Sequence, residues 1–215
     1  MALEREKRLA AEAAAQLVED GMVVGLGTGS TVAYLLSALA DRGLDVRCVA
    51  TSPATGTAAR ELGLRVETFA GVSAPARLDI AIDGADQVDT AGWLVKGGGA
   101  AHTREKAVAA AADRFVVIVD SSKLVERVRP PIPLELSEFG LAAALHRLGP
   151  VVLRDTMRSP DGGVIADYTG AFDDPRNLAD RLAAEPGVVE HGLFPPALVS
   201  EIVVARGDTI EIRRP

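Results

Sequence analysis

The sequence predicts an α/β fold in which helices cover a mostly parallel sheet and a smaller α+β unit is inserted late in the chain. Up to about residue 129, short apolar segments alternate with segments of helical period, as in a parallel sheet covered on both faces. Phe115–Val119, for example, is continuously apolar. Pro130, Pro131 and Pro133 then mark a boundary. We therefore expect one domain over residues 1–129 plus 197–215 and a small domain over 130–196.

The elements of the first domain follow from apolar spacing and from the glycines that end helices. A helix is expected over 2–20, where apolar residues recur at helical spacing and Gly21 follows. A short apolar strand over 22–26 runs into a glycine-rich turn, and a helix over 32–41 carries three inward leucines. The pattern then repeats, with strands expected over 45–50, 64–69, 78–82 and 115–119 and helices over 53–62 and 103–112.

The small domain shows a different order of elements. Strands are expected over 134–136, 151–154, 164–168 and 188–194, and helices over 137–148 and 175–184. This β-α-β-β-α-β order is typical of a ferredoxin-like unit. The tail, 199–213, reads as two strands that turn at Arg206-Gly-Asp208 and return to the first domain.

Four segments follow directly after predicted strands of the first domain. They are the glycine turn at 25–31, Thr51-Ser52, the segment 83–86 and the segment 120–123. Parallel sheets bind their ligands at the carboxyl ends of the strands. We therefore expect these four segments to converge on one edge of the sheet.

Composition and charge exclude several classes of function. The net charge of −7 argues against a nucleic-acid or acidic-membrane partner, because binding phosphate backbones requires clustered Lys and Arg. An anionic ligand therefore needs a local site. Cys48 is the only cysteine, which excludes disulfides within the chain and cysteine-based metal sites. Neither a signal peptide nor a run long enough to span a bilayer is visible, so a cytoplasmic location is expected.

The glycine turn reads as a cradle for a phosphate group. A strand, a glycine turn and a helix start place several backbone N–H groups around an anion, at the positive end of the helix dipole. Gly29 belongs to this turn, and Thr28, Ser30 and Thr31 add hydroxyl donors. The alternative is a tight turn in which Ser30 or Thr31 serves only as the N-cap.

Two acidic residues, Asp83 and Asp86, follow the strand over 78–82. One or both carboxylates are expected to face the ligand; the alternative is an Asx turn with solvated carboxylates. His102 is the only nearby histidine and no spaced set of metal ligands is visible, so no metal is expected.

A lysine and three glycines, Lys96-Gly97-Gly98-Gly99, precede the predicted helix that carries Glu105 on its first turn. Glycines there allow close approach of the backbone, whose N–H donors can stabilise developing negative charge. Glu105 is interpreted as a base facing the ligand; the alternative is a surface carboxylate that stabilises the helix dipole. His102 is interpreted as structural or solvent-facing.

In combination and order, these motifs resemble the type A ribose-5-phosphate isomerases. The segments are Gly-Thr-Gly-Ser-Thr31, Asp83-Gly-Ala-Asp86, the stretch 96–106, Asp120-Ser-Ser-Lys123 and the stretch 186–194, and the resemblance runs from about Lys7 to Phe194. It implies a Rossmann-like domain with an inserted ferredoxin-like lid. It also implies a homodimer or homotetramer, no metal or organic cofactor, and interconversion of ribose 5-phosphate and ribulose 5-phosphate in the non-oxidative pentose phosphate pathway.

The resemblance also assigns roles to single residues. Glu105 would move the proton between two carbons, Asp83 would shuttle the oxygen-bound protons and Asp86 would assist ring opening. Lys96 would stabilise the enediolate. The small-molecule sugar phosphate would be bound by Lys7, Thr28, Gly29, Ser30, Thr31, Gly97, Gly98, Gly99 and Lys123.

Other functions on a similar fold would show other features. An amino-sugar-phosphate deaminase or a sugar lactonase should carry a catalytic histidine in a distinct motif. A sugar-phosphate-sensing module should come with a DNA-binding helix-turn-helix and a basic patch. The chain departs from the family pattern in the small domain, notably over 137–148 and 159–163, and at its end. These departures bear on the lid and the oligomer rather than on the catalytic residues.

Overall fold

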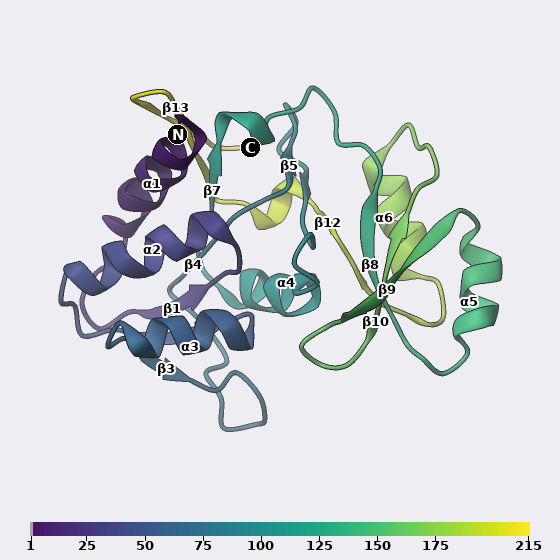
Figure 1. Cartoon of the computed structure of the whole chain (residues 1–215), viewed down its shortest axis with the longest axis horizontal. Coiled ribbons are helices and arrows are strands. Elements are labelled where there is room, and N and C mark those ends of the chain that lie inside the picture. The colour runs from purple at the N-terminus through teal and green to yellow at the C-terminus, as the bar shows by residue number, and fades with distance from the viewer. Residues whose placement is uncertain (1) are drawn as a thin grey trace. The chain divides into compact units, whose positions relative to one another are not determined.

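The computed structural model describes residues 2–215, apart from the side chains of residues 156 and 157, and divides into two compact units (Figure 1). The first unit comprises Met1–Ala85, Arg104–Leu124 and Ala197–Pro215, and the second comprises Asp86–Thr103 and Val125–Pro196. The second unit is thus larger than the 130–196 domain expected from the prolines. Residues 86–103 belong to it because their strands pair with others of that unit, and Val125 N donates to Val88 O at 2.9 Å.

The first unit is built on a seven-stranded sheet of order β14-β13-β7-β4-β1-β2-β3. All neighbouring strands are parallel except the antiparallel pair β13–β14, which confirms the mostly parallel sheet and the returning tail. The strands are β1 (Val23–Leu26), β2 (Arg47–Ala50), β3 (Arg65–Glu67), β4 (Ile80–Asp83), β7 (Phe115–Asp120), β13 (Glu201–Arg206) and β14 (Thr209–Arg213).

Helices cover both faces of this sheet. Side chains alternate along a strand, so Val24 and Leu26 of β1 face one side, where they join a core that includes α1 and α2. Gly25 faces the other side, where Val108 of α4 packs so closely that a Cβ atom would lie 2.5 Å from it. The helices of this unit are α1 (Ala2–Ala15), α2 (Ser30–Asp41), α3 (Pro53–Glu61) and α4 (His102–Ala111), whose first two residues belong to the second unit.

The first helix is shorter than predicted. It ends at Ala15 rather than near residue 20, and the next residues form tight turns, such as Leu17 N to Ala14 O at 3.0 Å. The Arg42 guanidinium donates to the carbonyls of Ala15 and Val18, the latter at 2.6 Å. An arginine from a following turn thus satisfies carbonyl groups at the helix end, a contact that apolar spacing cannot reveal.

The second unit contains the predicted ferredoxin-like arrangement. Its four strands are antiparallel in the order β11-β8-β10-β9, and the element order is β-α-β-β-α-β. Both helices contribute apolar side chains to one core with β8 and β10. α5 begins at Leu141 rather than at 137 because Gly140 is left-handed, with φ 77°. The elements are β8 (Ile132–Leu136), α5 (Leu141–Leu148), β9 (Val151–Arg158), β10 (Val164–Tyr168), α6 (Pro175–Ala183) and β11 (Val188–His191).

A small three-stranded sheet of order β12-β6-β5 completes the second unit. It consists of β5 (Gln87–Val88), β6 (Leu94–Val95) and β12 (Leu193–Phe194), and Lys96 and the three glycines follow β6 directly. Two-residue strands are too short to show an alternating pattern, so β5 and β6 were not predicted. The remaining elements are two short 3-10 helices, Ser121–Lys123 and Pro196–Leu198. Within residues 2–215 no helix combines the length and apolar character needed to cross a membrane.

Candidate active site

In the first unit, the glycine turn after β1 and the aspartate that ends β4 are in contact. The backbone N–H of Thr28 donates to Asp83 Oδ1 at 3.0 Å, and that of Gly84 donates to the same oxygen at 2.7 Å. Asp83 is only 3% exposed. A Cβ atom at Gly27 would lie 1.9 Å from Asp83 Oδ1, so glycine is required there. The turn thus holds a buried carboxylate at the carboxyl edge of the sheet, as the shared edge predicted.

The N-terminus of α2 follows immediately. Its N-cap is Gly29, with φ 132°, so the interpretation of Ser30 or Thr31 as N-cap is wrong: both lie within the first turn. Because glycine has no side chain to cap the first N–H groups, those groups and the hydroxyl of the exposed Ser30 remain suited to an anion. Thr31, the second residue of the helix, is 9% exposed.

Hydroxyl groups from two neighbouring strand ends meet beside this turn. Thr28 Oγ1 lies 2.8 Å from Thr51 Oγ1 and 3.3 Å from Thr55 Oγ1, and Ser52 Oγ donates to Thr55 Oγ1 at 3.0 Å. The sequence placed Thr51-Ser52 at this edge but gave no sign of Thr55, which is the third residue of α3. The network joins the turns after β1 and β2 and fixes the Thr28 side chain.

Lys7 and Lys123, the two lysines of the first unit that were predicted to bind substrate, lie on segments that Glu6 connects. Glu6 is 6% exposed and accepts from Ser121 N at 2.9 Å and Gly207 N at 2.8 Å; these bonds lower the pKa of Glu6. Lys7 follows it on α1, and Lys123 ends the 3-10 helix that Ser121 begins. Because the Glu6 carboxylate on α1 accepts from the backbone N–H of Ser121, the segments that carry Lys7 and Lys123 are fixed relative to each other.

Acidic groups keep Lys7 protonated. Its Nζ contacts Glu4 Oε1 at 2.6 Å, and this hydrogen bond, with added attraction from Glu4 and Asp120, raises the pKa of Lys7. Asp120 is 1% exposed, and its Oδ1 accepts from Ser122 N at 3.0 Å. Within residues 2–215 no hydrogen-bond partner reaches its buried Oδ2. This buried acid, at the end of β7, was not singled out from the sequence as a site residue.

In the second unit, Asp86 is bonded to the glycine loop. Its backbone N–H donates to Val95 O at 2.8 Å, and its Oδ2 accepts from Gly98 N at 2.8 Å. Lys96 is 3% exposed, and its Nζ lies 5.6 Å from the centre of the Phe194 ring. An ammonium group over a ring face is stabilised as a cation. Asp86, Gly98 and Gly99 are exposed.

Glu105 lies on the first turn of α4 and is buried, with 5% of its surface exposed. The alternative of a surface carboxylate is therefore wrong. His102, the first residue of the helix, has no exposed surface, which rules out the solvent-facing interpretation. A Cβ atom at Gly97 would lie 2.7 Å from His102 Nδ1, so the ring fills the space that this glycine leaves.

Comparison with known proteins decides the family. A family model described as ribose 5-phosphate isomerase A (phosphoriboisomerase A) matches residues 47–209. The ribose-5-phosphate isomerase A of Natronomonas pharaonis is 44% identical to the chain, over 98% of the chain and 97% of the relative. The chain belongs to the ribose 5-phosphate isomerase A family.

Solved structures support this membership. Ribose 5-phosphate isomerase A of Methanocaldococcus jannaschii aligns with a TM-score of 0.91 at 34% identity and covers 99% of each chain. A D-ribose-5-phosphate isomerase in complex with phospho-erythronic acid aligns with a TM-score of 0.91 at 32% identity over 100% of each chain. The resemblance and the fold class predicted from the sequence are confirmed, and the chain is an isomerase.

A second family model, the DeoR C terminal sensor domain, matches residues 3–72 of this isomerase family member. That stretch contains the strand, glycine turn and helix formed by β1 and α2. It ends before Asp83, Lys96 and Glu105, all of which lie within the isomerase match. The sensor match is thus confined to the N-terminal third of the chain and does not reach these three residues.

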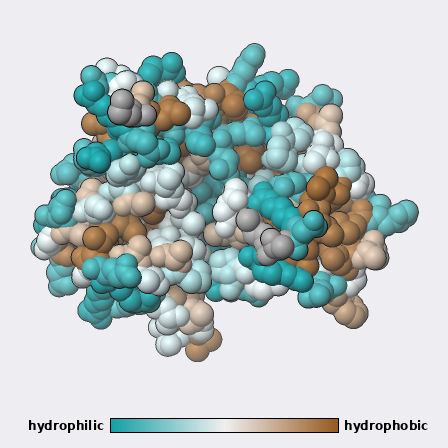
Figure 2. All heavy atoms as spheres, in the orientation of Figure 1, coloured by the Kyte–Doolittle hydropathy of each residue, from teal (hydrophilic) through white to brown (hydrophobic). Residues whose placement is uncertain are grey.

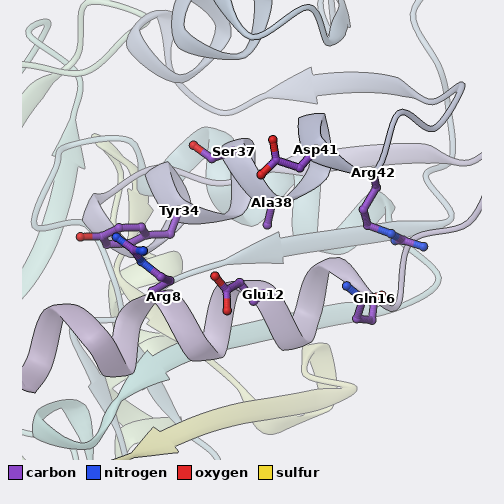
Figure 3. Close-up of a pocket in the computed structure, with 8 residues that line it drawn as sticks. All are labelled: Arg8, Glu12, Gln16, Tyr34, Ser37, Ala38, Asp41 and Arg42. Atoms are coloured by element: carbon purple, nitrogen blue, oxygen red, sulfur yellow. The ribbon is translucent and has the colours of Figure 1, made fainter.

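A polar groove lies elsewhere on the first unit, between α1 and α2 (Figure 3), and has a volume of about 470 Å³. The Arg8 guanidinium lies 5.3 Å from the centre of the Tyr34 ring, and Arg42 is already bonded to carbonyls of the preceding turn. None of the residues predicted to bind substrate lines it; the lining residues are Arg8, Glu12, Gln16, Tyr34, Ser37, Ala38, Asp41 and Arg42.

Proposed function

We propose that the chain interconverts D-ribose 5-phosphate and D-ribulose 5-phosphate through an enediolate, with Glu105 as the base. The observation that carries the proposal is the buried Glu105 carboxylate on the first turn of α4, three residues after His102 begins that helix, in a member of this family. A buried, positioned carboxylate is the group that removal of a carbon-bound proton requires.

The proposed reaction moves two protons and leaves the atom count unchanged. Glu105 takes the proton from C2 of the open-chain aldose, which gives an enediolate. The carboxyl proton exchanges in part with solvent, and Glu105 then delivers a proton to C1. The hydroxyl on O2 loses its proton and the carbonyl oxygen O1 gains one, so the aldose becomes the ketose. No redox group or covalent nucleophile is needed. The same groups act in reverse, as microscopic reversibility requires.

The remaining acidic and basic groups have proposed roles in this scheme. Asp83 would exchange the oxygen-bound protons, since it is buried and held by two backbone N–H groups. Asp86 would assist opening of the sugar ring. Lys96 would stabilise the negative oxygen of the enediolate, aided by N–H donors of the glycine loop. The buried ammonium of Lys96 supports this role, because charge stabilisation is stronger where water is excluded.

The phosphate of the substrate would be bound at the N-terminus of α2. Gly29 and the first-turn residues Ser30 and Thr31 offer backbone N–H and hydroxyl donors, and Thr28 is fixed beside them. Lys7 and Lys123 would add positive charge. The related isomerase that binds phospho-erythronic acid supports an acyclic, phosphorylated and anionic ligand of this size.

An assay of the purified protein tests the proposal. Ribose 5-phosphate is added with and without EDTA, and formation of ribulose 5-phosphate is followed. We expect conversion in both cases, because side chains alone supply the acid–base chemistry. Absence of conversion overturns the proposed reaction, and loss of conversion with EDTA overturns a metal-free mechanism. A place in the non-oxidative pentose phosphate pathway would follow from the reaction itself.

A further inference from the structure

Two carbonyl groups of the glycine loop of the second unit accept hydrogen bonds from one arginine of β9. Arg154 Nη1 donates to Gly97 O at 2.9 Å and to Gly98 O at 3.2 Å. The sequence gave no role to this residue. Two consecutive carbonyls of the loop therefore point toward the same guanidinium group.

Fixing these carbonyls also fixes the direction of the following N–H groups. In a planar trans peptide the C=O and the N–H of the next residue point in opposite directions. Gly97 O faces Arg154, and the N–H of the same peptide group, from Gly98, points to Asp86 Oδ2 at 2.8 Å. By the same rule, the N–H of Gly99 points away from Arg154. The arginine thus directs two consecutive N–H donors to the side on which Asp86 lies.

The backbone of the loop needs such support. Gly97 has φ 107°, and a Cβ atom there would meet His102 and Pro133 at 2.7 and 2.8 Å. Ala100, which ends the loop, has φ 62° and is the one residue other than glycine with positive φ among residues 2–215. Glycine adopts a positive φ readily, but for Ala100 it costs about 1–3 kcal/mol and persists where surrounding contacts impose it. The bonds from Arg154 and Asp86 supply contacts of that kind.

Arg154 is itself anchored. Asp167 of the neighbouring strand β10 accepts from Nε at 2.8 Å and from Nη2 at 2.7 Å, which is a two-point arginine–carboxylate pair. This hydrogen-bonded partner, with added attraction from Asp167 and Asp86, raises the pKa of Arg154. The planar fork of arginine serves the carboxylate and the carbonyls at once, which a lysine ammonium cannot do with the same geometry.

We propose that Arg154, held by Asp167, is a positioning residue for the isomerase reaction: it orients the N–H groups of Gly98 and Gly99 toward Asp86 and toward the oxygens of the reacting sugar. The inference rests on the proposed function, because the donors matter only if an enediolate oxygen forms beside them. Donors positioned before the reaction stabilise charge that develops in the transition state, so Arg154 should act on turnover rather than on phosphate binding.

Arg154→Lys and Asp167→Asn test the proposal, with Arg147→Lys as the matched control. Arg147 lies in the same unit and also combines an ion pair, to Glu185 at 2.6 Å, with a carbonyl bond, to Pro186 O at 3.0 Å, but it does not contact the loop. For each variant we would measure kcat and KM for ribose 5-phosphate, inhibition by inorganic phosphate, and Tm. Loss of a single oxyanion donor costs about 10²–10³-fold, so a misdirected pair should lower kcat by at least about tenfold.

We expect Arg154→Lys to lower kcat while KM and phosphate inhibition stay within about threefold of the wild-type values. Asp167→Asn should have the same effect more weakly. Arg147→Lys should keep the wild-type kcat. A wild-type kcat in Arg154→Lys, or an effect on KM and phosphate inhibition alone, overturns the positioning role. So does an equal fall in kcat in Arg147→Lys. A wild-type protein that does not convert ribose 5-phosphate instead overturns the proposed function itself.

Discussion

Three ionisable side chains, Asp83, Lys96 and Glu105, are each at most 5% exposed. Burial of a charged group is unfavourable unless hydrogen bonds or charges compensate it, and such groups gather at functional sites. All three were selected from the sequence because they adjoin glycine turns at strand ends or helix starts. Their burial could not be read from the sequence, since it depends on which strands become neighbours.

Glu6 is a buried contact residue that selection by glycine turns and strand ends did not find. It lies in a charged N-terminal stretch, Glu4-Arg-Glu-Lys-Arg8, and was not distinguished from its neighbours. Only the structure brings it against Ser121 and Gly207, which follow it by more than a hundred residues. Arg154 is a similar case, because its role depends on strand register and on the position of a distant loop.

Glu6 should stabilise the fold at neutral pH and not in acid. Its pKa is lowered by hydrogen bonds from Gly207 and Ser121, so the carboxylate stabilises the folded state above its ordinary value of 4.5, and this is lost as the pH falls through the lowered value. Glu6→Gln should therefore reduce the free energy of unfolding by about 1–3 kcal/mol at neutral pH, with a smaller difference in acid. Urea unfolding across pH measures this. The exposed Glu61→Gln serves as control; a difference for Glu6→Gln that grows in acid contradicts the assignment.

At the scale of elements, strongly periodic segments were predicted well and irregular ones were not. The strands β1, β4 and β7 and the helix α2 lie within a few residues of their predicted bounds, because buried apolar runs and inward leucines mark them. The end of α1, the start of α5 and the short strands β5 and β6 were missed. Each of these depends on a contact or a left-handed glycine rather than on a repeated pattern.

The turn between β1 and α2 gives a prediction at this scale. Gly27→Ala would place a methyl group where Asp83 Oδ1 lies, at 1.9 Å, so the carboxylate must move. A displacement of about 1 Å in a catalytic group can cost about 100-fold in rate, and we expect at least that loss in kcat. The control is Gly56→Ala in α3, whose Cβ would meet no atom closer than 3.3 Å. Steady-state kinetics and Tm compare the two; equal kcat would show that Asp83 does not need its present position.

At the scale of the whole molecule, the match to the family extends over nearly the full chain, whereas each motif alone was ambiguous. The sequence identified the family because several motifs occur together and in the order typical of that family. The homodimer or homotetramer stays a prediction. The second unit exposes Phe139, Val152, Leu153 and Val189, and Figure 2 shows hydrophobic residues gathered at the right-hand end of the view, near α5. Light scattering of the purified protein would give the oligomeric state.

The most direct test of the account follows deuterium from solvent into the sugar. Wild-type protein and Glu105→Gln are incubated with ribose 5-phosphate in D₂O, and label at C1 of ribulose 5-phosphate is measured by NMR together with the rate. An enediolate formed by a carboxylate base predicts label from solvent in the wild type, and a loss of about 10²–10⁴-fold in both turnover and labelling in Glu105→Gln. Turnover of Glu105→Gln at the wild-type rate would contradict the account.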